Sequence, residues 1–178
     1  MAQLHNLPSL PCALRPAPFV ELQNVLSSEI TAISPFVDRL MQFFRVLIKN
    51  FGDVDEDEVD IQIALREALS NAIIHGNREN PCKRVYVTCR LSMDGEVSLT
   101  VSDEGEGFNS RAIPDPTDPE NRLLSNGRGI YLMRSFMDGV SFEENGKVVQ
   151  MRKRLRRRLT KVETLPPGSV FCFANSRG

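Results

Sequence analysis

The sequence predicts an α+β fold, a two-layer sandwich with helices on one face of a mixed, mostly antiparallel sheet. Apolar residues recur every three or four positions in two segments between residues 34 and 75, the spacing of a helix with one buried face. Apolar residues then alternate on both sides of an Asp-Gly turn between residues 84 and 103, which predicts a hairpin. Because helices and strands come in blocks, we expect no doubly wound parallel sheet.

Length and composition suit one globular protein. Of the 178 residues, 41% are hydrophobic and 25% charged, so the chain can bury a core without disulfides or structural metals. The four cysteines lack C-x-x-C spacing, which predicts reduced thiols and no zinc site. The first residues lack the basic head and apolar run of a signal peptide, and no segment reaches the roughly 18 apolar residues of a membrane span. We therefore expect a cytoplasmic protein that does not enter a membrane.

The first half of the chain is predicted to form a tail, a strand and two helices. Residues 1–18 contain four prolines and are expected to be a flexible tail, followed by one domain over residues 19–178. A strand is expected over 19–28. A Ser-Pro pair at positions 34 and 35 opens the first helix, because proline at the first helical position loses no hydrogen bond. The second helix is expected over 57–75, and a glycine follows it.

The second half is predicted to be mainly strands. The alternating segments 84–91 and 97–103 form the hairpin, a short helix is expected to follow, and three more strands complete the sheet. These later elements are expected over residues 129–137, 140–142, 148–155 and 170–173. Residues 104–126 are rich in Gly, Pro, Asp and Asn, which makes this segment too long and too polar for a routine connection.

Three polar motifs interrupt this pattern, and the first lies on the second helix. Glu67, Asn71 and His75 are spaced four residues apart, so they are expected along one helical face. An amide oxygen can ligate magnesium in a phosphate site, and a carboxylate one turn away can orient or deprotonate a nucleophile. The alternative is an ordinary solvated stripe on an amphipathic helix.

The other two motifs are rich in glycine. Asp103 follows a strand and precedes Gly105 and Gly107, so its carboxylate can accept the amine of adenine while the glycines allow close backbone approach. Gly127 and Gly129 come just before the short helix, whose free N–H groups suit a phosphate. Either motif alone can be a simple turn or helix start. Neither is a P-loop, because no Gly-Lys-Ser or Gly-Lys-Thr follows.

Taken together and in this order, the motifs resemble the N box and the two glycine boxes of the GHKL ATPase superfamily. The stretches LREALSNAIIHGN, VSDEGEGF and NGRGIYLMRSFMDGVSF are most similar to those of the bacterial anti-sigma factor serine/threonine kinases. The resemblance covers roughly residues 20–175. It implies a Bergerat fold, with ATP held between helices and sheet beneath a mobile lid over residues 108–126.

The resemblance also implies roles for individual residues. Glu67 would be the catalytic base, Asn71 the Mg²⁺ ligand beside the nucleotide, and Asp103 the residue that holds adenine. A serine near the C-terminus follows a glycine where the family often has Gly-Thr, and its hydroxyl is expected beside the adenine-binding carboxylate. That serine is Ser169. By the resemblance, Gly105 and Gly107 would also lie beside the adenine, and Gly127, Arg128 and Gly129 would close on the phosphates.

The activity implied by the resemblance is that of a protein kinase that is also an anti-sigma factor. Such a protein uses ATP and Mg²⁺ to phosphorylate a serine on a small antagonist protein, and it sequesters a sigma factor. Dimers are common in the resembling family, which makes a homodimer one of the alternatives, but the sequence does not fix the oligomeric state. The alternative is a nucleotide-dependent binding module of another partner-switching pathway that lacks kinase activity.

One charged segment lies outside these motifs. Residues 1–150 contain 14 basic and 22 acidic residues, whereas residues 151–178 contain 8 and 1. Most of the excess lies in the run Arg152–Arg158, which suits either a polyanion or a solvated strand edge. No aromatic residues are interleaved with these charges, so we expect no direct nucleic-acid partner.

Overall fold

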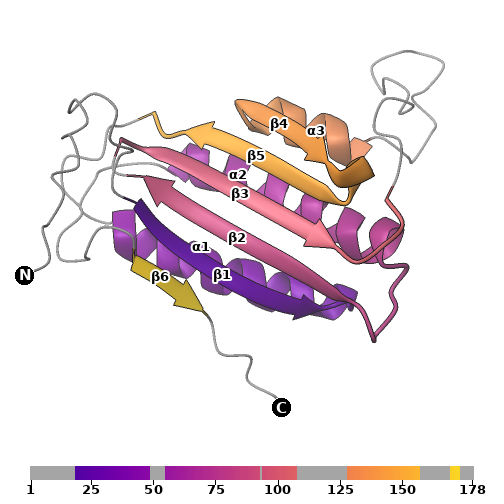
Figure 1. Cartoon of the computed structure of the whole chain (residues 1–178). Coiled ribbons are helices and arrows are strands. Elements are labelled where there is room, and N and C mark those ends of the chain that lie inside the picture. The colour runs from indigo at the N-terminus through magenta and orange to yellow at the C-terminus, as the bar shows by residue number, and fades with distance from the viewer. Residues whose placement is uncertain (1–18, 49–54, 93, 108–127, 157–168, 173–178) are drawn as a thin grey trace, which may run out of the picture.

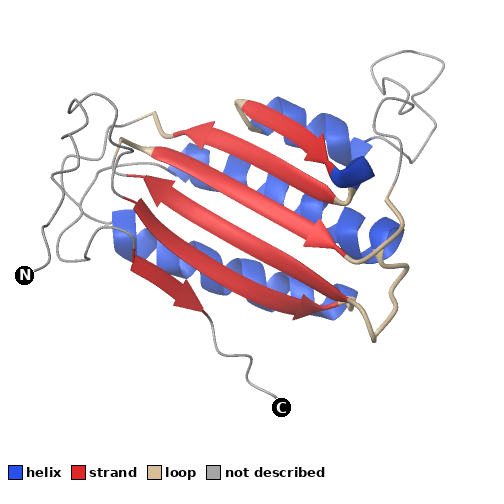
Figure 2. Ribbon diagram, in the orientation of Figure 1, coloured by secondary structure: helices blue, strands red, loops and turns tan. Residues whose placement is uncertain are grey.

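A computed structural model of the chain shows a sheet with helices on one face only (Figure 1). It describes residues 19–48, 55–92, 94–107, 128–156 and 169–172. The predicted two-layer α+β sandwich is confirmed, and Figure 2 shows the helices gathered behind the strands. The expected tail over residues 1–18 and the expected lid over 108–126 lie outside the described residues.

The sheet has six described strands in the order β4-β5-β3-β2-β1-β6. Every neighbouring pair is antiparallel except β1 and β6, which run parallel. The predicted mixed, mostly antiparallel sheet is therefore confirmed. The strands are β1 (Phe19–Ser27), β2 (Arg84–Ser92), β3 (Glu96–Asp103), β4 (Gly139–Glu143), β5 (Val148–Arg154) and β6 (Ser169–Cys172).

Three α-helices are described: α1 (Ile33–Ile48), α2 (Asp55–Ser70) and α3 (Arg128–Phe136). The predicted second helix is α-helical only to Ser70, and it continues as the π-helix η3 (Asn71–Gly76). The predicted helix to residue 75 is therefore confirmed, but its last part is π-helical and not α-helical. Two short 3-10 helices, η2 (Ile30–Ala32) and η6 (Glu144–Gly146), complete the set. No described helix is long and apolar enough to cross a membrane.

The hydrophobic core lies between the helices and the inner face of the sheet. The inward residues of β2 and β3 are almost completely buried, as alternation predicts for an antiparallel sheet with one covered face. Leu40 on α1 and Leu65 on α2 pack against this face. Cys89 is one of the buried residues, and burial raises the pKa of its thiol, so it behaves as a neutral core group. Helix α2 is thus fixed on the sheet along its whole length.

The described part of the basic run alternates between solvent and the core: Arg152, Arg154 and Arg156 are exposed, whereas Lys153 is buried. Lys153 points to the helical side, is 7% exposed, and its Nζ lies 2.7 Å from Oδ2 of Asp60 and 2.8 Å from the carbonyl oxygen of Phe136. The N–H of Arg156 donates to Oδ2 of the buried Asp57 at 2.8 Å. Lys153 on β5 and Arg156 just after it therefore bind acidic residues near the start of α2.

Candidate functional site

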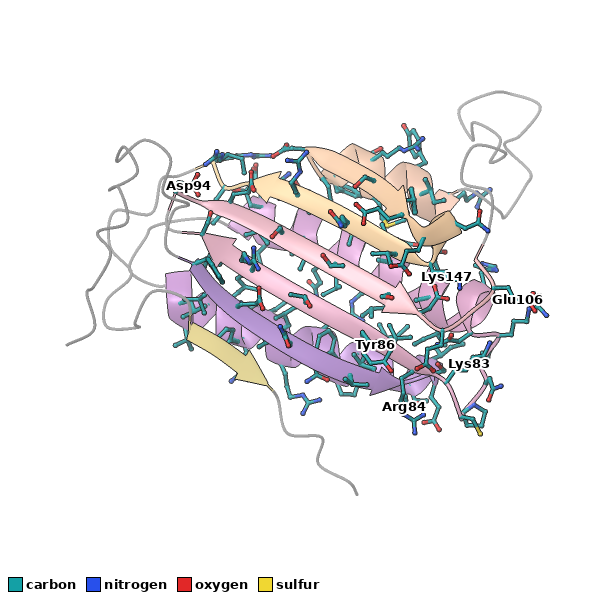
Figure 3. All side chains as sticks on the ribbon, in the orientation of Figure 1. Lys83, Arg84, Tyr86, Asp94, Glu106 and Lys147 are labelled. Carbon is teal, nitrogen blue, oxygen red and sulfur yellow. The ribbon has the colours of Figure 1, made fainter. Side chains whose placement is uncertain are left out.

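The three polar motifs meet where α2 ends, β3 ends and α3 begins. Their side chains reach this point from separate elements, because α2 crosses the inner face of the sheet and α3 packs beside it. Figure 3 shows the residues labelled around the end of β3, with Lys147 and Glu106 on one side and Lys83, Arg84 and Tyr86 on the other. Asp94 lies at the opposite end of the sheet.

Glu67 and Asn71 lie against the first turn of α3. A Cβ atom added to Gly129 would lie 2.7 Å from Oε2 of Glu67 and 3.3 Å from Nδ2 of Asn71. The carboxylate and the amide therefore converge on the backbone at the positive end of a helix. Arg128, the first residue of α3, is exposed. The structure thus joins the first and third motifs, while Gly127 lies outside the described residues.

The contact at Gly129 gives a testable prediction. In Gly129→Ala the new methyl group can be accommodated only if the flexible end of Glu67 moves. We expect a free energy of unfolding within about 1 kcal/mol of wild type. If Glu67 has the catalytic role that the resemblance implies, the turnover of ATP should fall about tenfold, since a misplacement of about 1 Å at a reacting group is costly. Steady-state assays with chemical denaturation check both values. Unchanged turnover would show that Glu67 need not keep this position.

Asp103 is the last residue of β3, and its carboxylate is half-buried. Its Oδ1 accepts a hydrogen bond from the N–H of Gly105 at 2.8 Å. Burial raises the pKa of Asp103, while this hydrogen bond and the charges of Lys147 and Lys83 act in the opposite direction. Asp103 forms no ion pair among the described residues. The site therefore presents a partly desolvated carboxylate with acceptor capacity to spare.

The energetic cost of this carboxylate predicts the behaviour of Asp103→Asn. The amide keeps an oxygen for Gly105 but carries no charge, so we expect the apoprotein to be at least as stable as wild type at pH 7. Because the folded pKa of Asp103 is raised, the wild type gains stability as the pH falls through that pKa, and the difference should shrink there. Urea unfolding at several pH values checks this. A variant clearly less stable than wild type at pH 7 would contradict it.

Two glycines let the end of η3, which continues α2, touch the end of β3. A Cβ on Gly105 would overlap the carbonyl oxygen of Gly76, and a Cβ on Gly76 would lie 2.5 Å from both carboxylate oxygens of Asp103. The π-helix η3 brings Gly76 to this point, since π turns widen a helix locally and are frequent at functional sites. The sequence analysis predicted Gly76 only as the residue that ends the helix. The same glycine also allows the close contact with Gly105 and Asp103.

Gly107 packs against a turn between β4 and β5. Its φ is +82°, a backbone conformation that favours glycine. A Cβ there would overlap the carbonyl oxygen of Asn145 and lie 3.2 Å from Cγ of Lys147. Gly107 therefore packs closely against the turn before β5, which is a neighbour of β3.

Asn77 connects the strands around the site, and the sequence analysis missed it. Its side chain is buried, and Nδ2 donates to Oγ of Ser28 at 2.7 Å and to the carbonyl oxygen of Arg84 at 2.8 Å. Its Oδ1 accepts from the N–H of Glu104 at 2.8 Å. One amide thus ties together the segments next to β1, β2 and β3. An asparagine after a helix-ending glycine gives no sequence signal for this role.

Ser169 does not lie beside Asp103. It is on β6, which pairs with β1 at Val20, whereas the neighbours of β3 are β2 and β5. Two strands separate β6 from β3, and Val20 pairs with Leu91 at the far end of β2. The expectation that the Ser169 hydroxyl reaches Asp103 is therefore wrong. The sequence could not show which strand lies next to β3. That neighbour is β5, and the residue that contacts the backbone of Asp103 there is Lys147, just before β5.

The described residues fit a magnesium ion shared with a phosphate ligand. No group of three or more His, Cys, Asp or Glu side chains is placed for a metal among them. Magnesium usually uses one or two side chains together with substrate phosphates and water. Asn71 beside the start of α3 meets that need. His75 is exposed at the end of the π turn, and nothing assigns it a chemical role.

Comparisons with known proteins agree with this geometry. The description "Histidine kinase-like ATPase domain" belongs to the family model that matches residues 36–153. The anti-sigma F factor of Heyndrickxia coagulans is 41% identical over 145 residues, which are 75% of this chain and 95% of that protein. The anti-sigma F factor of Bacillus subtilis (strain 168) is 34% identical, with 75% and 94% covered.

A second group of similar proteins carries an enzyme name. The serine-protein kinase RsbW of Staphylococcus epidermidis is 25% identical over 142 residues, which are 76% of this chain and 89% of that protein. The chain covers nearly all of each of these relatives. The matched family model includes α2, α3 and β3, the elements that build the site. The chain therefore belongs to the histidine kinase-like ATPase family.

Proposed function

We propose that the chain is an ATP- and Mg²⁺-dependent serine/threonine protein kinase that acts as an anti-sigma factor. Its targets would be a small antagonist protein, which it phosphorylates, and a sigma factor, which it sequesters. The observation that carries the proposal is the convergence of Glu67 and Asn71 on the first turn of α3. Relatives named as anti-sigma F factor and as serine-protein kinase support it.

Adenine recognition is assigned to the end of β3. Asp103 has a half-buried carboxylate that retains acceptor capacity after its bond to Gly105, so it can accept a hydrogen bond from the exocyclic amine of adenine. Gly76 and Gly105 have no Cβ atoms, which lets the end of η3 pack directly against the end of β3 and the Asp103 carboxylate. We expect Asp103→Asn to weaken ATP binding about tenfold, because the amide can turn a donor toward the amine.

The phosphates are assigned to the start of α3. The first turn of a helix offers free N–H groups and a positive dipole end to an anion. Asn71 lies beside this turn and can offer its amide oxygen to magnesium. When bound, magnesium neutralises charge on the phosphates during transfer. Arg128 is exposed at the same helix end and adds a positive charge there.

Glu67 is assigned the role of general base. Its Oε2 lies at the start of α3, where the terminal phosphate would be bound. The serine hydroxyl oxygen of the antagonist forms a bond to the γ-phosphorus, the bond to the oxygen bridging the β- and γ-phosphorus breaks, and Glu67 takes the hydroxyl proton. Adenosine diphosphate leaves with the bridging oxygen.

Calorimetric titration tests the nucleotide part of the proposal. Wild type should bind ATP with Mg²⁺, and Asp103→Asn should bind it about tenfold more weakly. Equal affinity in the two proteins would remove Asp103 from the site. ATP binding without transfer to any antagonist protein would favour the nucleotide-dependent binding module over the kinase. Light scattering of the purified chain shows whether it forms a homodimer.

A further inference from the structure

A lysine, Lys147, is the cross-strand neighbour of Asp103. The N–H of Asp103 donates to the carbonyl oxygen of Lys147 at 3.1 Å. Val101 pairs with Val149 and Ser102 with Val148, so the next pair in this antiparallel register is Asp103 with Lys147. Lys147 itself lies just before β5 and ends η6, with helical backbone angles (φ −72°, ψ −24°). Its backbone therefore lies beside that of Asp103 at the point where the β3–β5 ladder ends.

The side chain of Lys147 lies along the glycine motif. A Cβ on Gly107 would lie 3.2 Å from Cγ of Lys147, so the aliphatic part of the lysine passes this glycine. The residue is half-buried. Its charge also reaches the carboxylate, since Lys147 lowers the pKa of Asp103 against the effect of burial. Lys147 thus lies at the end of β3 that carries Asp103, where Figure 3 labels it.

The ammonium group of Lys147 has no ion pair or side-chain hydrogen bond among the described residues. Lys153 differs in this respect, because it bonds to Asp60 and to a carbonyl oxygen. Lys147 and Asp103 do not pair with each other either. A donor and an acceptor therefore arise from residues whose backbones are adjacent at the end of the β3–β5 ladder, and neither satisfies the other.

We propose that Lys147 is a second base-recognising residue, whose ammonium donates to a ring nitrogen of adenine while Asp103 accepts from the 6-amino group. This inference rests on the proposed nucleotide site. Adenine has an acceptor nitrogen on each side of its amine, N1 and N7, so a neighbouring donor and acceptor match its edge. Guanine presents a carbonyl oxygen at the same carbon, and that oxygen would face the carboxylate without a proton between them.

Calorimetry with base-modified nucleotides tests this inference. The ligands are ATP, 1-deaza-ATP and 7-deaza-ATP, each with Mg²⁺, and the proteins are wild type, Lys147→Met and Lys83→Met. Methionine keeps the length and packing of the lysine. Lys83 is the matched control, because its charge also acts on Asp103 but it lies ahead of β2, on the other side of β3.

Lys147→Met should bind ATP about tenfold more weakly than wild type, the value of one hydrogen bond from a charged donor. One deaza analogue should bind wild type about tenfold more weakly than ATP and lose nothing further in Lys147→Met. Lys83→Met should stay within about twofold of wild type.

Three results would overturn the inference while leaving the proposed function intact. They are unchanged ATP affinity in Lys147→Met, an equal loss for ATP and both deaza analogues in that variant, and wild-type affinity for both analogues equal to that for ATP. Wild type that binds no ATP would overturn the inference and the proposed function together. Thermal unfolding of Lys147→Met confirms that the comparison is made on folded protein.

Discussion

Glu67→Gln should abolish most phosphate transfer and largely spare nucleotide binding. Glutamine keeps the size and packing of the side chain against Gly129, but its amide cannot accept the proton of a serine hydroxyl. Loss of a general base lowers the rate by about 10²–10⁴. The measurement is the single-turnover rate of transfer from labelled ATP to an antagonist protein, together with ATP affinity by calorimetry.

Glu143→Gln is the matched control for this variant. This substitution removes the same negative charge, but at a residue that is exposed on the edge strand β4. It should transfer phosphate at the wild-type rate. If Glu67→Gln also did so, Glu67 would not be the base, whatever its effect on binding.

Among the variants proposed for this protein, Lys153→Met should lower the free energy of unfolding most. Lys153 is buried and bonds to Asp60, and it lies 4.0 Å from Oδ1 of the buried Asp57. Methionine fills the space but leaves the carboxylate of Asp60 without its cation. Removing one partner of a buried ion pair typically costs about 3–5 kcal/mol. Urea unfolding monitored by circular dichroism gives the free energy of unfolding.

Arg154→Met is the control on the next residue of the same strand. Arg154 pairs with Asp94, and both side chains are substantially exposed at 55% and 43%. An exposed pair contributes about 0–1 kcal/mol, so this variant should stay near wild type. An equal loss of unfolding free energy in Lys153→Met and Arg154→Met would show that the buried ion pair of Lys153 contributes no more to stability than the exposed pair of Arg154.

The sequence predicted the elements whose signals are local. The apolar spacing of α1 and α2 and the alternation of β2 and β3 follow from one-sided burial, and such burial is visible in any window of the chain. The resemblance of the three polar motifs to those of the GHKL ATPases predicted that Glu67, Asp103 and Gly129 belong to one site. The structure places these residues around the ends of α2 and β3 and the start of α3.

The features that sequence reasoning missed depend on contacts between distant segments. The π turn at residues 71–76 accompanies the contact of Gly76 with Gly105. The position beside Asp103 belongs to Lys147 and not Ser169 because β5, not β6, is the neighbour of β3. The charge of Lys153 is matched by Asp60, a residue on another element. No local pattern carries this information.

The central claim is that this chain transfers the terminal phosphate of ATP to a serine of an antagonist protein. The most direct measurement incubates wild type with γ-labelled ATP, Mg²⁺ and small antagonist proteins from the same genome, and then locates the label by mass spectrometry. The account predicts label on one serine of one antagonist, lost when that serine is replaced by alanine. Tight ATP binding with no labelled antagonist would contradict the kinase assignment.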